Sequence, residues 1–391
     1  MPEVIDLVVD GKAASALAAG WPSVSLREVA GPTTSAGRAV RLKSPAGKLL
    51  AHGVADPGHQ TVWAVAAREG EDIEEALGAR LAAAVKLRKR LFAGASTDAY
   101  CLFHGEGDGA AGLVVERFGA FAVLYVYSRA LAALSETMAR MLLEQEGVEG
   151  VVRKFRLKGK DKADEIAEDR FGEEPPDELV VHEEGVPFEV HLKGSLNVGL
   201  FTDMREVRRR FARAVPEGTF ANLFAYTGAF SVVAARAGTK AVSVDISSGV
   251  LGWAEDNFRL SKIDPASHEF SVHDAITFLK LAERRGWVYD SILLDPPSFS
   301  ESRRGGWVYK RDFPMLLRLA LQTVAPGGQL WVTSNMRNMR EGALEKWIGL
   351  AAGQVRRRID VLEVFGLPPD RPSPLPYDEA RYLEVHALRI W

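Results

Sequence analysis

The sequence predicts an α/β protein whose carboxyl-terminal half is a doubly wound sheet with helices on both faces. Three observations predict this fold. Strand-like and helix-like segments alternate from residue 219 to the end of the chain. A single glycine, Gly228, lies in the turn after the first of these strands, and the second strand ends on an acid, Asp245. Ligands bind at the carboxyl ends of strands in such sheets, so we expect a site at that edge.

The elements of this half follow from hydrophobic periodicity. Residues 219–223 predict an apolar strand, residues 229–237 a helix rich in Ala and Val, and residues 240–245 a β-branched strand. Further helices are expected from residues 249, 275, 313 and 341, and further strands near residue 269 and at 291–294, 329–333, 359–365 and 382–390. We therefore place one domain at residues 191–391.

The first 190 residues are expected to form two smaller domains. Residues 1–70 contain short strands, including a hairpin at 40–53 around a Pro-Ala-Gly turn. They predict a small β-rich domain that either binds RNA or caps the larger domain. Residues 71–190 begin with a helix at 71–92 and continue as a central α+β domain, in which two strands flank a glycine-rich bend at 100–117.

Basic residues cluster at two places. One cluster is a run interleaved with Phe155 and Leu157, and its members are Arg153, Lys154, Arg156, Lys158, Lys160 and Lys162. The other lies on a predicted helix at 206–215 and consists of Arg208, Arg209, Arg210 and Arg213. Such runs are most often solvated, but they would contact phosphates if the partner is a nucleic acid. The acidic segment 161–177, which contains two consecutive prolines, predicts a loop.

Composition narrows the class of protein. The chain has 391 residues, 47% of them hydrophobic, and a formal net charge of -3, which is typical of a globular protein without a uniformly basic surface. Its single cysteine, Cys101, excludes an internal disulfide framework and a cysteine-rich zinc site, and we expect no metal. The amino terminus has no basic region followed by an apolar run, so we expect no signal peptide. No apolar stretch approaches the roughly 20 residues of a membrane span, and we expect a soluble cytoplasmic protein.

The turn at 222–228, Asn-Leu-Phe-Ala-Tyr-Thr-Gly, discriminates between nucleotide ligands. A dinucleotide site needs G-x-G-x-x-G so that the backbone can approach a pyrophosphate, and here Phe224 and Tyr226 replace the glycines. A Walker phosphate loop is absent from this turn. The turn suits a ligand with adenosine and no phosphate, such as S-adenosylmethionine. The ribose hydroxyls of that ligand could donate hydrogen bonds to Asp245. The alternatives are an NAD-dependent oxidoreductase, which the missing glycines disfavour, and a βαβ unit without a ligand.

A second motif, Asp295-Pro-Pro-Ser-Phe299, directly follows the strand at 291–294 and should lie at the same edge of the sheet. Two prolines fix the backbone and remove two N–H donors, which leaves carbonyl acceptors and a carboxylate beside an aromatic ring. These groups can hold a flat nucleobase. Phe299 would stack on the base, while Asp295 and the Pro296 carbonyl would accept its N–H protons.

With these motifs the chain resembles the S-adenosylmethionine-dependent methyltransferases of 23S ribosomal RNA. In that family a PUA RNA-binding domain and a central α+β domain precede a Rossmann-like class I methyltransferase domain. The resemblance is strongest at residues 199–300 and extends to Glu106-Gly-Asp-Gly-Ala-Ala-Gly-Leu113. It implies S-adenosylmethionine as the cofactor and 23S ribosomal RNA as the partner, and it leaves open whether the protein is a monomer or a homodimer.

The resemblance also implies roles for individual residues. Asp203 belongs to an entry segment near the methionine end of the cofactor. The predicted cofactor-binding residues are Phe201, Arg205, Asn222, Phe224, Tyr226, Gly228, Asp245 and Asp274. The residues predicted to act on the base are Asp295, Pro296 and Phe299. With RNA as the partner, the residues predicted to contact it are Arg153, Lys154, Lys158 and Arg209.

One departure from the family bears on the chemistry. Members that methylate cytosine at carbon-5 resemble one another in a Ser-Cys-Ser segment after the strand that follows Asp-Pro-Pro, and Asn335 stands at the position of that cysteine here. Asparagine cannot be the nucleophile. The local pattern is closer to relatives that methylate guanine N7, where a ring nitrogen attacks the methyl group directly. We therefore expect methylation of a ring nitrogen such as guanine N7. The alternatives are a cytosine carbon-5 methyltransferase and a catalytically degenerate RNA-binding or ribosome assembly factor.

Overall fold

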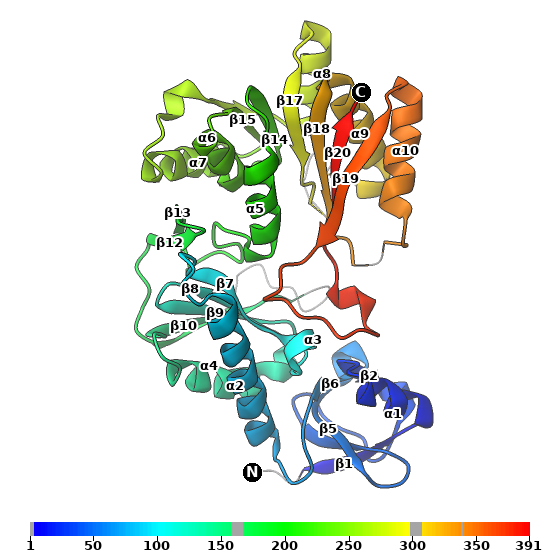
Figure 1. The fold of residues 1–391 in the computed structure, drawn as a ribbon. Helices are drawn as coiled ribbons and strands as arrows, with labels where there is room; N and C mark the ends of the chain where they lie inside the picture. Colours follow the sequence, from blue (N-terminus) through cyan, green and yellow to red (C-terminus); the bar gives the residue numbers. More distant parts are fainter. Residues whose placement is uncertain (1–3, 158–166, 298–306, 338) are drawn as a thin grey trace. The chain divides into compact units, whose positions relative to one another are not determined.

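The computed structural model describes residues 4–157, 167–297, 307–337 and 339–391 (Figure 1). The chain divides into two compact units. The first unit contains residues 1–185, 190–198 and 369–380, and the second contains residues 186–189, 199–368 and 381–391. Both predicted amino-terminal domains, apart from residues 186–189, therefore fall in the first unit, and the division into three domains stays a prediction.

The first unit contains a six-stranded sheet with the strand order β2-β6-β5-β4-β1-β3. Its strands are β1 (Ile5–Val9), β2 (Ser23–Ser25), β3 (Val29–Ala30), β4 (Ala39–Lys43), β5 (Leu49–Asp56) and β6 (Thr61–Val65). Strands β4 and β5 form the predicted hairpin, and Val40 and Leu42 at alternating positions of β4 are fully buried. The β-rich character of this region agrees with the sequence, whereas the PUA assignment remains a prediction.

Helix α1 (Gly11–Ala18) lies where the sequence analysis predicted only short strands. Asp10 caps this helix by accepting a hydrogen bond from the backbone N–H of Ala13 at 2.8 Å. Ala13 and Leu17, four residues apart, face the core. The segment is too short for its periodicity to be recognised, so the capping acid was its one clear signal.

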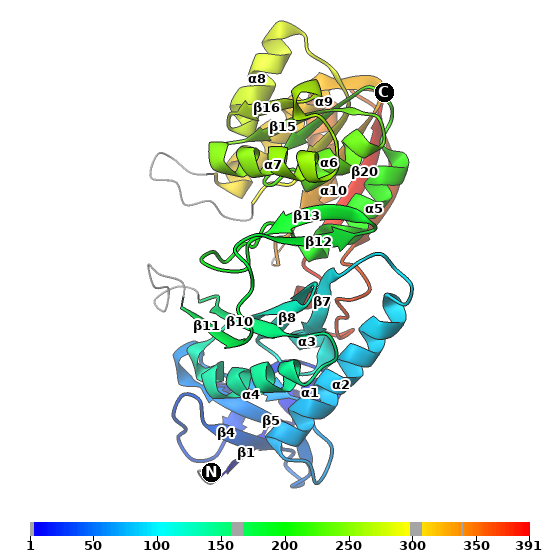
Figure 2. The ribbon, with the colours of Figure 1, turned by 90° about the vertical axis from the view of Figure 1, so that its left-hand side faces the viewer.

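A five-stranded sheet with the order β11-β10-β9-β8-β7 follows in the same unit (Figure 2). Its strands are β7 (Ala99–His104), β8 (Leu113–Phe118), β9 (Phe121–Val126), β10 (Gly150–Phe155) and β11 (Glu168–Gly172). Helices α2 (Ile73–Leu91) and α4 (Ala132–Leu143) pack on it, and α3 (Gly105–Asp108) is a single turn between β7 and β8. A hairpin of β12 (Leu179–Glu183) and β13 (Val186–Val190) comes next.

Strand β11 corrects the prediction that the acidic segment 161–177 is a loop. Residues 168–172 pair antiparallel with β10, in the register Arg153 opposite Asp169 and Lys154 opposite Glu168. Two opposite-charge pairs across the strands stabilise this pairing, which the acidic composition of the segment had concealed. Residues 158–166 of the segment lie outside the described part of the chain.

Residues 369–380 belong to the first unit although they connect the last two strands of the second. Buried polar contacts hold them there. One carboxylate oxygen of Asp370 accepts from the backbone N–H of Cys101 at 2.8 Å, and the carbonyl of Asp370 accepts from the Arg88 guanidinium at 2.6 Å. His104 Nδ1 donates to the Pro372 carbonyl at 2.7 Å. The predicted Pro-rich loop is thus an ordered part of this unit.

The second unit contains a seven-stranded sheet with the order β16-β15-β14-β17-β18-β20-β19. Its strands are β14 (Thr219–Leu223), β15 (Lys240–Asp245), β16 (Glu269–Val272), β17 (Tyr289–Leu294), β18 (Val324–Ser334), β19 (Ile359–Gly366) and β20 (Glu384–Ile390). The first five strands are parallel, and β20 pairs antiparallel with both β18 and β19. This is the predicted doubly wound sheet.

Helices cover both faces of this sheet (Figures 1 and 2). Helices α5 (Arg205–Ala214), α6 (Ala229–Arg236) and α7 (Ser248–Leu260) pack in sequence on one side, and α8 (Ala275–Arg285), α9 (Tyr309–Thr323) and α10 (Ala343–Val355) pack in sequence on the other. The core on the second side joins fully buried sheet residues such as Ile292 and Leu330 to Phe313 and Leu317 of α9. Among the described residues, no helix is long and apolar enough to cross a membrane.

Candidate active site

The predicted site residues of the second unit gather at one edge of the sheet. Strands β14, β15, β16, β17 and β18 are parallel, so all five carboxyl ends meet at this edge. The turn at 224–228 follows β14, Asp245 ends β15, and Asp295 follows β17. Side chains from distant parts of the sequence thereby share one surface, as expected for a doubly wound sheet.

The turn after β14 has an unusual backbone. Phe224 and Tyr226 have φ values of 64° and 49°, in the left-handed region that bulky residues rarely adopt. Hydrogen bonds on both sides hold this conformation. The N–H of Ala225 donates to the carbonyl of Val244 at 2.9 Å, and the N–H of Tyr226 donates to Asp245 at 3.0 Å. Such strain persists where the surroundings over-determine it, and it is common at ligand sites.

Gly228 is required for close packing as well as for its backbone conformation. It precedes α6 with φ 72°, and a Cβ atom added to it would lie 2.7 Å from the Cβ of Ala254 in α7. Only glycine combines this φ with so close an approach of the next helix. The single glycine of the turn therefore sets the position of α7 beside the site.

Asp245 is held in place through both of its carboxylate oxygens. Oδ2 accepts from the N–H of Tyr226 at 3.0 Å, and Oδ1 accepts from the N–H of Ser247 at 3.1 Å. Each carboxylate oxygen can accept two hydrogen bonds, so each retains one acceptor position for a ligand hydroxyl. A vicinal diol such as that of a ribose matches this pair of oxygens.

Buried polar contacts behind the turn support it. The Asn222 side chain is 1% exposed and donates to Ser231 Oγ at 3.0 Å, which Ser243 Oγ also contacts at 2.7 Å. Asn257 Nδ2 donates to the carbonyl of Thr227 at 2.9 Å. Asn222 thus ties β14 to α6 and β15. This geometry favours a positioning role for Asn222, whose predicted contact with the cofactor stays a prediction.

The predicted entry segment precedes α5. Phe201 is 39% exposed, and its ring centroid lies 5.1 Å from that of Tyr226. The Asp203 carboxylate accepts from the Tyr382 hydroxyl at 2.7 Å. Arg208 donates to the Phe201 carbonyl at 2.8 Å, while Arg205 is buried with 5% exposure. The segment therefore places the ring of Phe201 against Tyr226 of the turn, while its Asp203 carboxylate bonds Tyr382.

Asp295 is half-buried, and burial raises its pKa to about 6. A hydrogen bond from Thr333 Oγ1 at 2.5 Å works against this shift, and so does Arg208, whereas the charge of Asp203 adds to it. Pro296 is buried beside it. Phe299, the predicted stacking residue, lies outside the described residues. The carboxyl group is ionised at neutral pH, so it can accept hydrogen bonds from a base.

Asp274 and two apolar residues complete the edge. Asp274 is exposed and caps α8 by accepting from the N–H of Thr277 at 2.9 Å, which leaves part of its acceptor capacity open. Ile246 and Val272 are 69% and 51% exposed, and they follow Asp245 and end β16. The sequence analysis missed both residues. An apolar residue directly after a strand-terminal acid was the signal for Ile246.

Comparison with known proteins identifies the family. The family profile described as S-adenosylmethionine-dependent methyltransferase matches residues 124–349, which is more than half of the chain. The chain belongs to this family. Ribosomal RNA large subunit methyltransferase I of Escherichia coli O139:H28 is 31% identical over 367 residues, or 91% of each chain.

Further relatives agree with this assignment. The protein of the same name from Aliivibrio fischeri strain ES114 is 28% identical over 366 residues, which is 90% of this chain and 91% of that protein. SMU.776, whose crystal structure was solved in complex with SAH, has a TM-score of 0.86 at 25% identity and covers 99% of this chain and 100% of its own. The predictions of a class I methyltransferase fold and of S-adenosylmethionine as cofactor are confirmed.

Two of the predicted RNA-contacting residues of the methyltransferase are structural, which corrects the prediction. Arg153 is 8% exposed, bonds Asp169 at 2.5 Å and Ser135 at 3.1 Å, and lies over the rings of Phe155 and Phe171. Its guanidinium fastens β10 to β11 and to α4. Consecutive residues of a strand point to opposite faces of the sheet, and both side chains are buried here, which the sequence pattern alone did not reveal.

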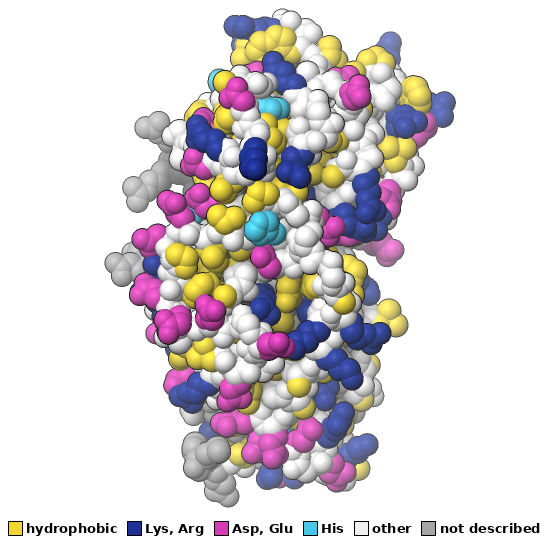
Figure 3. Space-filling view, turned by 60° about the vertical axis from the view of Figure 1, so that its left-hand side comes forward, with side chains coloured by type: hydrophobic (Ala, Val, Ile, Leu, Met, Phe, Trp, Pro, Cys, Tyr) yellow, Lys and Arg dark blue, Asp and Glu magenta, His cyan; other side chains and the backbone are white. Residues whose placement is uncertain are grey.

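Lys154 points to the other side of the same strand and is also buried. It is fully inaccessible, its ammonium donates to the Ser195 carbonyl, and burial lowers its pKa to about 8. Lys158 lies outside the described residues. Arg209 of α5 is 33% exposed and pairs with Glu206 at 2.5 Å, and its contact with RNA stays a prediction. On the face drawn in Figure 3, basic and acidic side chains are interspersed.

The single cysteine of the methyltransferase cannot serve as a nucleophile. Cys101 lies in β7 with no exposed surface, and burial raises the pKa of its thiol to about 12. The thiolate is the reactive form, so this side chain is inert at neutral pH. Asn335, at the position of the family's cysteine, is exposed directly after β18.

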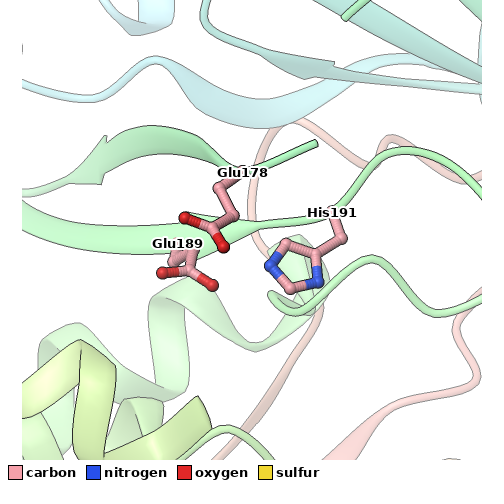
Figure 4. Close-up of side chains that lie close together, drawn as sticks. All are labelled: Glu178, Glu189 and His191. Atoms are coloured by element: carbon pink, nitrogen blue, oxygen red, sulfur yellow. The ribbon is translucent and has the colours of Figure 1, made fainter. Parts of the chain in front are cut away.

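Histidine and acidic side chains approach one another at two places in the described chain. Glu345, Glu384 and His386 form one group, in which His386 Nε2 lies 2.7 Å from Glu384. Figure 4 shows the other group, Glu178, Glu189 and His191, at the hairpin of β12 and β13. Exposed carboxylates are common at protein surfaces without an ion. We assign no metal to either group.

Proposed function

We propose that this methyltransferase transfers the methyl group of S-adenosylmethionine to a base of 23S ribosomal RNA. We further propose that the acceptor is a ring nitrogen such as guanine N7, attacked without a covalent enzyme–base adduct. The names of relatives that align over nine-tenths of the chain support the RNA substrate. One observation carries the choice of acceptor: the sole cysteine of the chain is fully buried with a pKa near 12.

The residues at the turn fit the cofactor without a phosphate site. Asp245 has two acceptor positions left for the ribose hydroxyls, and the exposed side chains of Ile246 and Val272 offer apolar surface for a flat adenine. Phe224 and Tyr226 stand where a dinucleotide site has the glycines that let a pyrophosphate approach the backbone. Asp203 supplies negative charge that would favour a cationic sulfur. When bound, S-adenosylmethionine supplies an electrophilic methyl group.

The chain's own residues act on the base by positioning it. A cytosine carbon-5 is not nucleophilic until a thiolate has added to carbon-6, whereas guanine N7 carries a free lone pair and needs only orientation. Asp295 would accept N–H protons of the base, and the Pro296 carbonyl would accept another. Alkylation at N7 leaves the ring cationic and releases no proton, so the site requires no general base. The Asp295 carboxylate would also stabilise the charge that develops on the ring.

Transfer of labelled methyl groups tests the proposed function. The purified chain, incubated with S-adenosyl-[methyl-³H]methionine and unmodified 23S RNA, should incorporate label into the RNA in a time-dependent manner. A catalytically degenerate assembly factor would bind the RNA and incorporate nothing above the no-enzyme level. Asp295→Ala is expected to reduce incorporation by at least about 100-fold, because it removes the group that orients the base.

Calorimetric titration tests the cofactor residues. Asp245→Ala should weaken S-adenosylmethionine binding by on the order of 10- to 100-fold, because it removes two charge-assisted acceptors and one support of the strained turn. The matched control is Asp264→Ala, which removes an acid that also accepts a backbone N–H but lies before a turn away from the β15 end. Equal affinity of wild type and Asp245→Ala would remove Asp245 from the site.

A further inference from the structure

A cavity lies within the first unit. Its volume is about 330 Å³, which is in the range of small-molecule sites. The end of α1, strands β5 and β6, the turn α3 and residues 373–374 line it. All of these segments belong to one unit. Its walls include apolar side chains from Leu17, Trp21, Leu50 and Pro374.

The motif Glu106-Gly-Asp-Gly, singled out in the sequence, forms one wall of this cavity. Part of the motif is architectural. Asp108 accepts from the fully buried Arg88 at 2.8 and 2.7 Å and from the N–H of His104 at 2.7 Å. A Cβ atom on Gly107 would lie 1.8 Å from the Pro372 carbonyl oxygen, so only glycine fits there. These contacts account for Asp108 and Gly107 of the motif. They give no structural role to Glu106.

Three charged side chains line the cavity, Arg80, Glu106 and Asp108, and the Asp108 carboxylate is already bound by Arg88. Glu106 is 11% exposed, and its carboxylate lies 3.7 Å from Nε2 of His104, whose pKa burial lowers. Arg80 projects from α2 on the same cavity, and its buried Nε atom has no hydrogen-bond partner among the described residues. A buried donor of a cation left without an acceptor costs about 1–3 kcal/mol or more. The lining of the cavity thus includes one unused donor, Nε of Arg80, and the carboxylate of Glu106.

This pair of charges selects the chemistry of the occupant. A phosphate or carboxylate would satisfy Arg80 but would be repelled by Glu106 and Asp108. A lipid chain would leave the Arg80 Nε donor without an acceptor. A nucleobase is neutral and carries donors and acceptors on its edges. Guanine presents N1–H and N2–H₂ donors on one edge and O6 and N7 acceptors on the other, which suit a carboxylate and a guanidinium respectively.

The apolar wall suits a flat ring. Trp21 is 38% exposed, and Tyr377 meets it edge-on at a ring-centroid distance of 5.0 Å and an angle of 74°, which fixes the indole. Bases splayed out of single-stranded RNA stack on such side chains. We propose that this cavity binds an unpaired guanine nucleotide of the RNA substrate, at a position distinct from the methylated base. This inference rests on the proposed function for the identity of the partner.

Changes to single ligand atoms test the proposal on the full chain. Fluorescence anisotropy would measure binding of the labelled ribonucleotides UUGUUU, UUIUUU and the 7-deazaguanosine analogue of UUGUUU. Inosine lacks the N2 amino group that would donate a hydrogen bond to Glu106. 7-Deazaguanosine lacks the N7 atom that would accept a hydrogen bond from Arg80. Each change should weaken binding to the wild type by on the order of tenfold.

The protein variants then locate the contacts. In Glu106→Gln, whose neutral amide oxygen is a weaker acceptor than a carboxylate, the loss caused by inosine should shrink, and in Arg80→Met the loss caused by 7-deazaguanosine should fall below about twofold. Asp295→Asn, in the candidate active site, should leave both losses in place. Trp21→Leu should weaken all three oligonucleotides by a common factor. Melting temperatures of each variant would confirm that it is folded.

Two results would overturn the assignment. The wild type could bind all three oligonucleotides equally, or the ligand-dependent losses could persist in Glu106→Gln and Arg80→Met while Asp295→Asn abolishes them. If Arg80→Met does not fold, the Glu106→Gln and Trp21→Leu measurements decide. Methyl transfer to 23S RNA is measured in a separate assay. A failure of methyl transfer would therefore not affect the oligonucleotide binding result, and a failure of oligonucleotide binding would not affect the methyl transfer result.

Discussion

Asp295 shows how its surroundings prepare a single carboxyl group for base binding. Burial raises its pKa, and the hydrogen bond from Thr333 limits the rise, so the group is ionised at pH 7 but close to its titration range. A carboxylate accepts hydrogen bonds from base N–H groups, whereas the protonated acid loses one acceptor oxygen. The activity of the enzyme should therefore depend on this one group near pH 6.

The rate of methyl transfer at saturating cofactor should rise as the pH increases from about 5 to 7, with an inflection near the pKa of Asp295 at about 6. Below that pH the group is protonated, so the acceptor is lost. Asp295→Asn should be slower at pH 7 by on the order of 100-fold and should lose the inflection. Rates measured across the pH range in both proteins check this. A wild-type profile that is flat between pH 5 and 7 would contradict the role of Asp295.

The raised pKa of Asp295 also predicts how the stability of the protein changes with pH. The folded pKa lies above the ordinary value of 3.8, so ionisation disfavours the folded state as the pH rises from about 4 to above 6. At pH 7 Asp295→Asn should be more stable than the wild type by roughly 1–3 kcal/mol. The difference should vanish near pH 4. Thermal unfolding at the two pH values measures it, and a variant less stable at pH 7 would contradict the burial argument.

At the scale of the element, the turn between β14 and α6 depends on one glycine. In Gly228→Ala the new Cβ would meet Ala254 at 2.7 Å on a backbone with φ 72°. We expect a loss of about 1–3 kcal/mol in stability and a matching loss of cofactor affinity, because α7 must move away from the turn. Chemical denaturation and calorimetric titration measure the two effects.

Gly252 in α7 is the matched control for this substitution. No atom lies within 4 Å of a Cβ added there, and its backbone is helical. Gly252→Ala should therefore be neutral or stabilising by up to about 1 kcal/mol, with cofactor affinity unchanged. If both variants lose affinity equally, the close approach of α7 at Gly228 is not what shapes the site.

Strand β10 carries the second prediction at this scale. Arg153 bonds Asp169, Ser135 and the Ala132 carbonyl, so Arg153→Gln should lower stability by about 2–4 kcal/mol. Lys89→Gln is the control, because Lys89 is 60% exposed and its pair with Glu146 should contribute under about 1 kcal/mol. The salt dependence of RNA binding should be the same in Arg153→Gln and the wild type. If the slope of log K against log salt concentration fell by about one in Arg153→Gln, Arg153 would contact a phosphate after all.

Elements with a clear period could be predicted from the sequence, and elements set by tertiary contacts could not. The alternation from β14 to β20 was predicted because strands buried on both faces are apolar runs and the helices between them keep their own period. Helix α1 was too short to show a period. Strand β11 is polar and is held by Arg153 and Lys154, which its own sequence does not reveal. The same contacts bury these two residues, which the sequence analysis predicted to contact RNA.

At the scale of the whole molecule, the candidate site was more predictable than the cavity in the first unit. The site follows from parallel strands, because an acid at the end of one strand and a motif after another must meet at the same edge. The cavity combines residues from α1, α2, α3 and 373–374, whose proximity no local pattern indicates. Residues 369–380 belong to the first unit through Asp370 and Pro372, although they are inserted between two strands of the second.

Mass spectrometry of ribosomal RNA nucleosides from cells that have or lack this gene would identify the methylated base. The account predicts that 7-methylguanosine decreases in the deletion strain and that a Cys101→Ala copy restores it fully, because the buried thiol takes no part in catalysis. Loss of 5-methylcytidine in the deletion strain, restored by the wild type but not by Cys101→Ala, would contradict the account.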